Sequence, residues 1–291
     1  MVIKWIICLL ILSNQMIASN APVFPEVRHF FDASNSDNNA LNYVFNGRLT
    51  QKPTNPSISF AHQSREWDYQ WYVLATTIPL MNDSGILSVG ASIYTSPSLP
   101  VTSSDSIGPY ISSYDSDTFF TLLMGYQPNI NGLNAQFILS SKYRKLMDVS
   151  ASQAAMDIHV SSPYILNNRL GIRSTNLLSS NYTWSTGKQE SLAKYIGIYF
   201  FQPIYFLQVL IEYDYAINYE NMNIFMSNAA FNLAPGLSVF STFRIANTYS
   251  VTSVGTKLEL SKNFVFDYIS QTESYTYGDE NIQSISIGVI L

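Results

Sequence analysis

In "FLQVLIEYDYAINYENMNIF", residues 206–225, apolar and aromatic residues occupy every second position from Leu207 to Ile217. Glu212 and Asp214 stand between them. Because successive side chains of a β-strand point to opposite faces, this alternation predicts a strand with one apolar face and one acidic face. Which of the two faces meets water decides the fold class.

The composition argues against an ordinary soluble domain. Of 291 residues, 47% are hydrophobic and only 12% are charged, which is about half the share of charge in a typical globular protein. Beyond the N-terminus no apolar run reaches the roughly 20 residues that a spanning helix needs. The formal net charge of −5 and the absence of a basic tract exclude nucleic acid as a partner.

The first residues read "MVIKWIICLLILSNQMIASNAP" and have the organisation of an export signal. Lys4 supplies a positive start, an apolar stretch follows, and small residues near Ser19 and Ala21 suit cleavage. We therefore expect a signal peptide over residues 1–20, the alternative being an uncleaved anchor helix. The only cysteine, Cys8, lies inside this segment, so the mature chain has no thiol for a disulfide or a metal.

Alternating stretches of about ten residues, separated by turn residues, continue through the rest of the chain. This pattern is typical of the strands of a membrane barrel. The pattern repeats about fourteen times, which predicts an all-β fold: a transmembrane antiparallel β-barrel over residues 53–291. The clearest of these stretches cover residues 85–94, 117–127, 132–143, 151–160, 236–247 and 263–271.

The lengths of the connections support a barrel with two different ends. Every second connection is short, and long Ser-, Asn- and Tyr-rich stretches at 95–116, 180–193 and 272–281 fall among the others. Outer-membrane barrels have short periplasmic turns and longer extracellular loops. We expect 95–116 to be extracellular and 128–131 to be periplasmic.

In such a barrel the apolar face of each strand meets lipid and the polar face meets the lumen. A basic residue facing lipid at the midplane costs about 2–4 kcal/mol, so charges should keep to the inward phase. Aromatic residues near strand ends, such as Trp67, Trp71, Tyr195 and Tyr199, fit an interfacial girdle. The polar residues expected to face the lumen are Asp157, His159, Arg173, Glu212, Asp214, Arg244, Lys257, Glu259 and Asp267.

Few side chains suggest chemistry. His159 and Ser161 share one strand face, but no nucleophile elbow or oxyanion motif accompanies them, so a structural lumen residue is the simpler interpretation. Asp115 and Asp117 could share a calcium ion, yet no ligand loop follows them. The sequence therefore predicts no enzyme, no metal site and no cofactor.

Several longer stretches resemble the PorV/PorQ-like family of outer-membrane barrels, which are FadL-like in architecture. The stretches are "GLNAQFILSSKYRKLMDVSASQAAMDIHV", "RLGIRSTNL", "VGTKLELSKNFVFDYISQ" and "QSISIGVIL". The resemblance implies that residues 21–52 form a hatch or plug folded into the lumen, the alternative being a disordered leader in the periplasm. The apolar residues of that plug would be Phe30, Phe31, Leu41, Tyr43 and Phe45.

The resemblance implies two functions for a protein of the bacterial outer membrane, in contact with its lipid. The first is passive passage or binding of a hydrophobic small-molecule ligand. The second is a PorV-like, non-transporting component of a type IX-like secretion or surface-attachment complex. In that case the long loops 95–116 and 179–193 would dock secretion-complex or surface-protein partners.

Overall fold

The computed structural model of the chain describes most of the barrel and a short part of the N-terminal segment. The expected signal peptide, residues 1–20, and the expected plug residues Phe30 and Phe31 lie outside the described residues. The described ranges are 40–46, 53–65, 70–81, 84–96, 99–104, 109–115, 117–130, 133–146, 148–163, 168–218, 223–247, 249–261, 263–275 and 278–291.

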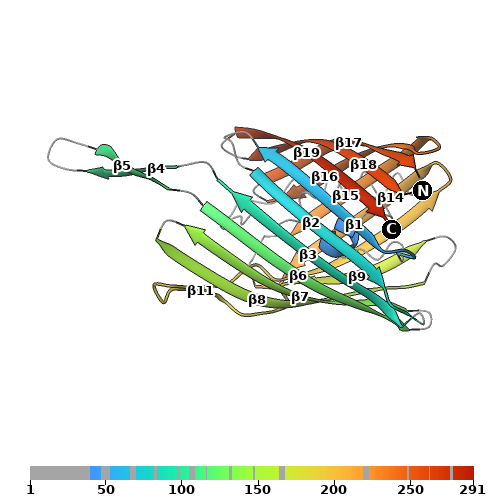
Figure 1. The fold of residues 1–291 in the computed structure, drawn as a ribbon, viewed down its shortest axis with the longest axis horizontal. Helices are drawn as coiled ribbons and strands as arrows, with labels where there is room; N and C mark the ends of the chain where they lie inside the picture. The colour runs from blue at the N-terminus through green and yellow to red at the C-terminus, as the bar shows by residue number, and fades with distance from the viewer. Residues whose placement is uncertain are drawn as a thin grey trace.

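Fourteen strands form one closed antiparallel wall, as the sequence predicts (Figure 1). The first strand, β1, pairs with the last, β19, from Ser57 opposite Ile290 to Arg65 opposite Ile282, which closes the sheet into a barrel. The wall strands are β1 (Ser57–Arg65), β2 (Gln70–Pro79), β3 (Gly85–Thr95), β6 (Asp117–Ile130), β7 (Leu133–Leu146), β8 (Val149–Ser161), β9 (Arg169–Thr175), β13 (Tyr195–Ile204), β14 (Leu207–Ala216), β15 (Ile224–Ala234), β16 (Leu237–Ala246), β17 (Tyr249–Ser261), β18 (Phe264–Tyr275) and β19 (Gly278–Ile290).

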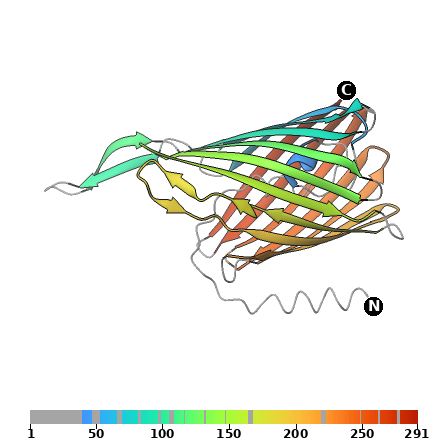
Figure 2. The same cartoon turned by 90° about the horizontal axis from the view of Figure 1, so that it is seen from below.

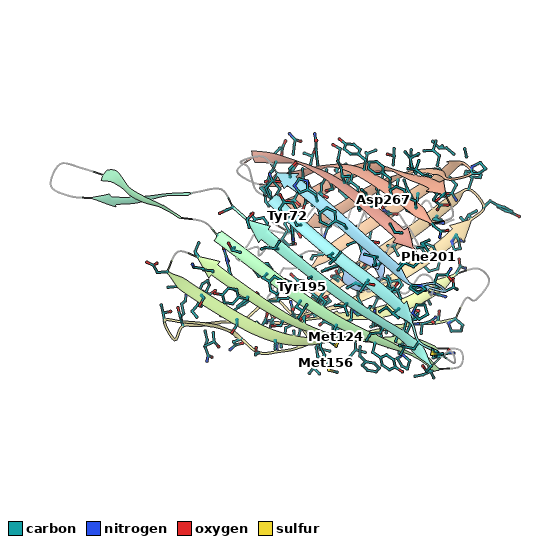
Figure 3. All side chains as sticks on the ribbon, in the orientation of Figure 1. Tyr72, Met124, Met156, Tyr195, Phe201 and Asp267 are labelled. Carbon is teal, nitrogen blue, oxygen red and sulfur yellow. The ribbon has the colours of Figure 1, made fainter. Side chains whose placement is uncertain are left out.

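The two phases of each strand differ in exposure. On β14, Tyr213 and Tyr215 are 43% and 56% exposed, whereas Glu212 and Asp214 between them are 1% and 4% exposed. The same rule separates the side chains labelled in Figure 3: Tyr72 and Met124 are exposed, and Phe201 and Asp267 are buried. An outer face of large apolar residues suits bilayer hydrocarbon, in which a closed barrel pairs its backbone groups within the protein.

Three residues of the expected aromatic girdle lie on the other face. Trp71, Tyr195 and Tyr199 are buried inside the barrel, so their assignment to the membrane interface is wrong. Trp67 lies outside the described residues. The error has a physical origin, because β2 and β13 carry apolar residues on both phases, and alternation alone cannot say which phase turns inward.

The connections at the two ends differ, although strands extend into the expected loops. Turns such as 205–206 and 235–236 join strands at one end. At the other end, β4 (Leu99–Ser104) and β5 (Pro109–Asp115) form a hairpin that projects far beyond the barrel (Figures 1 and 2). The loop expected over 272–281 is wrong for most of its length, since β18 runs to Tyr275 and β19 begins at Gly278.

The wall is irregular beside β8. Its backbone pairs with β9 only from His159 to Ser161, and the chain then bends at Asn176, whose φ is 55°. The short strands β10 (Leu178–Ser179) and β11 (Tyr182–Trp184) pair with the rest of β8, and β12 (Gln189–Glu190) pairs with β11.

Serine hydroxyls complete this part of the wall. The amide of Ile158 donates to Ser174 Oγ at 2.7 Å, that of Ala154 to Ser180 Oγ at 3.1 Å, and that of Ser150 to Ser185 Oγ at 3.2 Å. We call this line of side-chain hydrogen bonds, with acceptors Ser174, Ser180 and Ser185, the β8 seam.

The described part of the N-terminal segment lies inside the barrel. The π-helix η2 (Asn42–Asn46) is enclosed by the ring of strands in both views, and it packs against β2 and β3 (Figures 1 and 2). Leu41, Tyr43 and Phe45 are buried there. Within the described ranges, no helix is long and apolar enough to cross a membrane.

Candidate functional site

The lumen carries an aromatic surface on three neighbouring strands. Trp71 on β2 lies opposite Tyr94 on β3, and Tyr94 lies opposite Phe119 on β6. The rings of Trp71 and Tyr94 meet edge to face, with centroids 5.6 Å apart and an interplanar angle of 75°. All three residues are buried, and we call them the aromatic wall.

Apolar residues of the N-terminal segment extend the buried cluster that contains the aromatic wall. Leu41, Val44 and Phe45 belong to the same buried cluster. Gly90 on β3 makes room for them, because a Cβ at this position would lie 2.6 Å from Val44 Cγ1 and 2.9 Å from the Phe45 ring. The inner surface of β3 therefore accepts an aromatic ring at Gly90, in the same buried cluster as Trp71, Tyr94 and Phe119.

Two polar contacts anchor this segment. The backbone amide of Ala40 donates to Ser59 Oγ on β1 at 3.1 Å. The Tyr43 hydroxyl donates to Gln127 Oε1 on β6. With contacts on β1, β3 and β6, residues 40–46 are held against one side of the lumen.

The opposite side of the lumen holds a buried ion-pair cluster. Arg173 on β9 pairs through Nη2 with Asp214 Oδ2 at 2.8 Å and through Nε with Glu212 Oε1, both on β14. Between β9 and β14 runs β13, where Gly197 lies directly opposite both Arg173 and Asp214. A Cβ at Gly197 would collide with the Asp214 carboxylate, so the glycine is what lets Arg173 reach across.

A second glycine, Gly171 on β9, leaves space for the side chain of Tyr199. Gly171 lies opposite Tyr199 on β13, and a Cβ built on Gly171 would overlap the Tyr199 ring. Tyr199 is fully buried, and its ring covers the bare backbone of β9 at Gly171.

Gly171→Ala should lower the free energy of unfolding by about 1–3 kcal/mol, the usual cost of overpacking a well-packed interior. Urea unfolding in lipid vesicles measures this difference. The double variant Gly171→Ala with Tyr199→Ala removes the ring that the new methyl group meets. It should therefore lose less than the two single changes together. Additive losses would show that the two side chains do not meet.

Further ion pairs lie near the end of the barrel that bears the β4–β5 hairpin. Arg65 on β1 reaches Glu273 on β18 at 3.3 Å and Glu280 on β19 at 3.4 Å, across the closure of the barrel. Arg144 on β7 makes two hydrogen bonds to the Asp117 carboxylate on β6, at 2.5 and 3.1 Å. Asp117 is thus the first residue of a wall strand and is paired with an arginine of the neighbouring strand.

Nearby, Lys142 on β7 donates to Asn176 Oδ1 at 2.8 Å, which ties β7 to the bend that follows β9. On the outer connection, a hydrogen bond from Lys188 lowers the pKa of Glu190.

The structure also places the remaining polar residues that the sequence singles out. Asp157, His159, Arg244 and Asp267 are buried on the inner face, and Asp267 accepts a hydrogen bond from Ser286 at 2.8 Å. His159 Nε2 lies 3.2 Å from the carbonyl oxygen of Ser174. Lys257 and Glu259 pair with each other at 2.7 Å near the short-turn end of β17.

These residues do not form one centre. The structure brings Arg173, Glu212 and Asp214 into one cluster, with His159 directly opposite Arg173. Lys257 lies opposite Asp267 and pairs with Glu259 on another part of the wall. Among the residues that the structure describes, no three His, Cys, Asp or Glu side chains are arranged to hold a metal ion.

Sequence reasoning missed the aromatic wall and the glycines that shape the lumen. Gly90, Gly171 and Gly197 all occupy inward positions of strands, and each faces a large side chain from another segment. A glycine inside a strand often marks a place where another part of the protein comes close to the backbone. The positions of these glycines in the sequence were therefore the signal that could have located the close contacts.

No protein-family model matches the chain, and no curated protein matches it either. Among solved structures it is similar to the CymD monoaromatic hydrocarbon channel, with a TM-score of 0.65 and 9% identity over 89% of this chain and 94% of that one. It is also similar to the Pseudomonas putida toluene transporter TodX, with a TM-score of 0.54 and 10% identity over 95% of this chain and 96% of that one.

At such low identity the likeness shows the fold, and the resemblance to the PorV/PorQ-like family stays a prediction. A closed antiparallel barrel with an apolar outer wall is the architecture of outer-membrane proteins, and it places this chain in the bacterial outer membrane.

Proposed function

We propose that this protein is a FadL-like passive channel for small, uncharged, largely apolar molecules, with no catalytic step. The observation that carries the proposal is the aromatic wall, a buried apolar surface on the inside of a barrel. Such a surface favours apolar solutes over ions, because apolar side chains attract apolar solutes.

The charges of the lumen fit the same proposal. Arg65, Arg144 and Arg173 are each paired with one or two carboxylates. Neutralisation at these three arginines weakens the field with which they would concentrate anions. The similar barrels described as a monoaromatic hydrocarbon channel and a toluene transporter are consistent with an apolar solute.

Uptake in intact cells tests the proposal. The chain is expressed in the outer membrane of a bacterium that lacks hydrocarbon channels and carries an intracellular toluene-responsive reporter. At low external toluene we expect a several-fold faster response than with an empty vector. We expect Trp71→Ser to remove most of that gain while the barrel still folds, as shown by its heat-modifiable migration on a gel. A response equal to that of the empty vector would contradict the proposal.

The projecting β4–β5 hairpin favours a second candidate, a component of a secretion or surface-attachment complex. Deleting residues 97–116 separates the two functions. A channel should keep its toluene response without the hairpin, whereas a docking component should lose surface-attached proteins and show no change in uptake.

A further inference from the structure

One polar side chain beside the aromatic wall is buried without an obvious partner. Gln63 on β1 is 0% exposed and lies directly opposite Trp71 on β2 and Ser284 on β19. Within the described part of the chain, neither its amide nitrogen nor its amide oxygen has a hydrogen-bond partner. Directly opposite residues have Cβ atoms about 4.5–5.5 Å apart, so the carboxamide is within reach of whatever contacts Trp71.

Two hydroxyls continue this polar border on the neighbouring strands. Ser92 on β3 and Thr121 on β6 lie opposite each other, two positions along from Tyr94 and Phe119 on the same face. Both are buried, and among the described residues their hydroxyl oxygens also lack partners. The aromatic wall therefore has hydrogen-bonding groups on two of its sides.

Such groups are unusual in a folded interior. Most buried polar atoms are hydrogen-bonded, and leaving one unpaired costs about 1–3 kcal/mol. A carboxamide both donates and accepts, as a hydroxyl does. The nearby arginines are already paired, Arg65 with Glu273 and Arg144 with Asp117. Lys142, opposite Thr121, donates to Asn176. Among the described residues, the groups beside Trp71 therefore offer neutral hydrogen bonds.

We propose that the aromatic wall and Gln63 together bind aromatic molecules that carry one neutral hydrogen-bonding substituent, such as a phenol. The ring packs on Trp71, Tyr94 and Phe119, and the substituent bonds to the Gln63 carboxamide. The Phe45 ring, which packs at Gly90 in the same buried cluster, shows that the inner surface of β3 accommodates an aromatic ring. The inference rests on the proposed channel function and narrows its substrate class.

The test compares p-cresol with p-xylene, which differ by a hydroxyl in place of a methyl group. Dissociation constants are measured by isothermal titration calorimetry on the purified chain in detergent. Because p-xylene is the more hydrophobic of the two, the informative quantity is the ratio of the two constants in each variant. In Gln63→Leu the affinity for p-cresol should fall about fivefold, the worth of one net hydrogen bond, while that for p-xylene holds or rises.

Gln136→Leu is the matched control. Gln136 on β7 is also fully buried, and its amide atoms too have no partner among the described residues. On β7, Arg144 is the residue opposite Phe119, and Gln136 lies eight residues away from it along the strand. At about 3.3 Å per residue, Gln136 is roughly 26 Å from the aromatic wall. This variant should keep the wild-type ratio. Gln63→Met, of similar volume, replaces Gln63→Leu should the latter fail to fold.

The outcomes separate the inference from the function on which it rests. Binding of both probes with the same ratio in the wild type and Gln63→Leu would overturn the role of Gln63 and leave the channel proposal standing. Failure of both probes to bind the wild-type protein would count against the apolar channel itself, whereas failure of p-cresol alone would overturn the inference about Gln63. An equal change of ratio in Gln136→Leu would also overturn the assignment, because it would mean that the effect is not local.

Discussion

Arg173→Met is expected to lower the free energy of unfolding by about 3–5 kcal/mol, the range for removing one partner of a buried ion pair. The substitution leaves the Glu212 and Asp214 carboxylates buried in the wall without their shared cation. The penalty comes from the uncompensated charge, so it should exceed the loss for an ion pair nearer to water.

Urea unfolding of the barrel in lipid vesicles measures the change. Arg144→Met provides the comparison, because the Arg144 and Asp117 side chains are 21% and 14% exposed and water can take the place of the lost arginine. The triple variant Arg173→Met with Glu212→Gln and Asp214→Asn removes the stranded charges and should recover much of the stability. A single Arg173→Met as stable as the wild type would show that the three groups are not coupled.

Ile198→Arg is expected to destabilise the barrel by about 2–4 kcal/mol, the cost of a basic side chain on the lipid face near the midplane. Ile198 is 58% exposed on β13, and its cross-strand neighbours Ile172 and Tyr213 are exposed as well. The new guanidinium would therefore enter hydrocarbon and meet no carboxylate.

Leu260→Arg is the matched control for depth. Leu260 is 66% exposed on the same outer face, but it is the last residue but one of β17. At the end of the strand an arginine side chain can reach the membrane–water interface, so the loss in free energy of unfolding should be about 0–1 kcal/mol. Equal losses for the two variants, measured by the same unfolding titration, would be incompatible with a bilayer around the outer wall.

The sequence predicted the strand repeat and the antiparallel barrel, and these predictions are confirmed. The reason is that the membrane imposes a strong, local rule: on strands such as β14, one phase is apolar and the other polar. Where both faces of a strand are apolar, as around Trp71 and Tyr199, the rule cannot tell the lipid-facing side from the lumen side. Those residues were therefore assigned to the wrong side of the wall.

The lumen could not be predicted in the same way, because its contacts depend on the register between strands. Trp71, Tyr94 and Phe119 become neighbours only when β2, β3 and β6 pair as they do, with β4 and β5 left out of the wall. Arg173 likewise reaches Asp214 only because β9, β13 and β14 align Gly197 between them. Period-two alternation contains no information on that alignment.

The β8 seam predicts that backbone amides on the two edges of β8 exchange their protons at different rates. The amides of Ser150, Ala154 and Ile158 donate to serine hydroxyls, and turning one serine side chain releases such an amide without separating two strands. In an antiparallel ladder the intervening amides point the other way, towards β7, which pairs with β8 along its whole length. In native-state hydrogen exchange, the amides of Ser150, Ala154 and Ile158 should then lose their protons by local fluctuation, and the amides that face β7 only when the barrel unfolds.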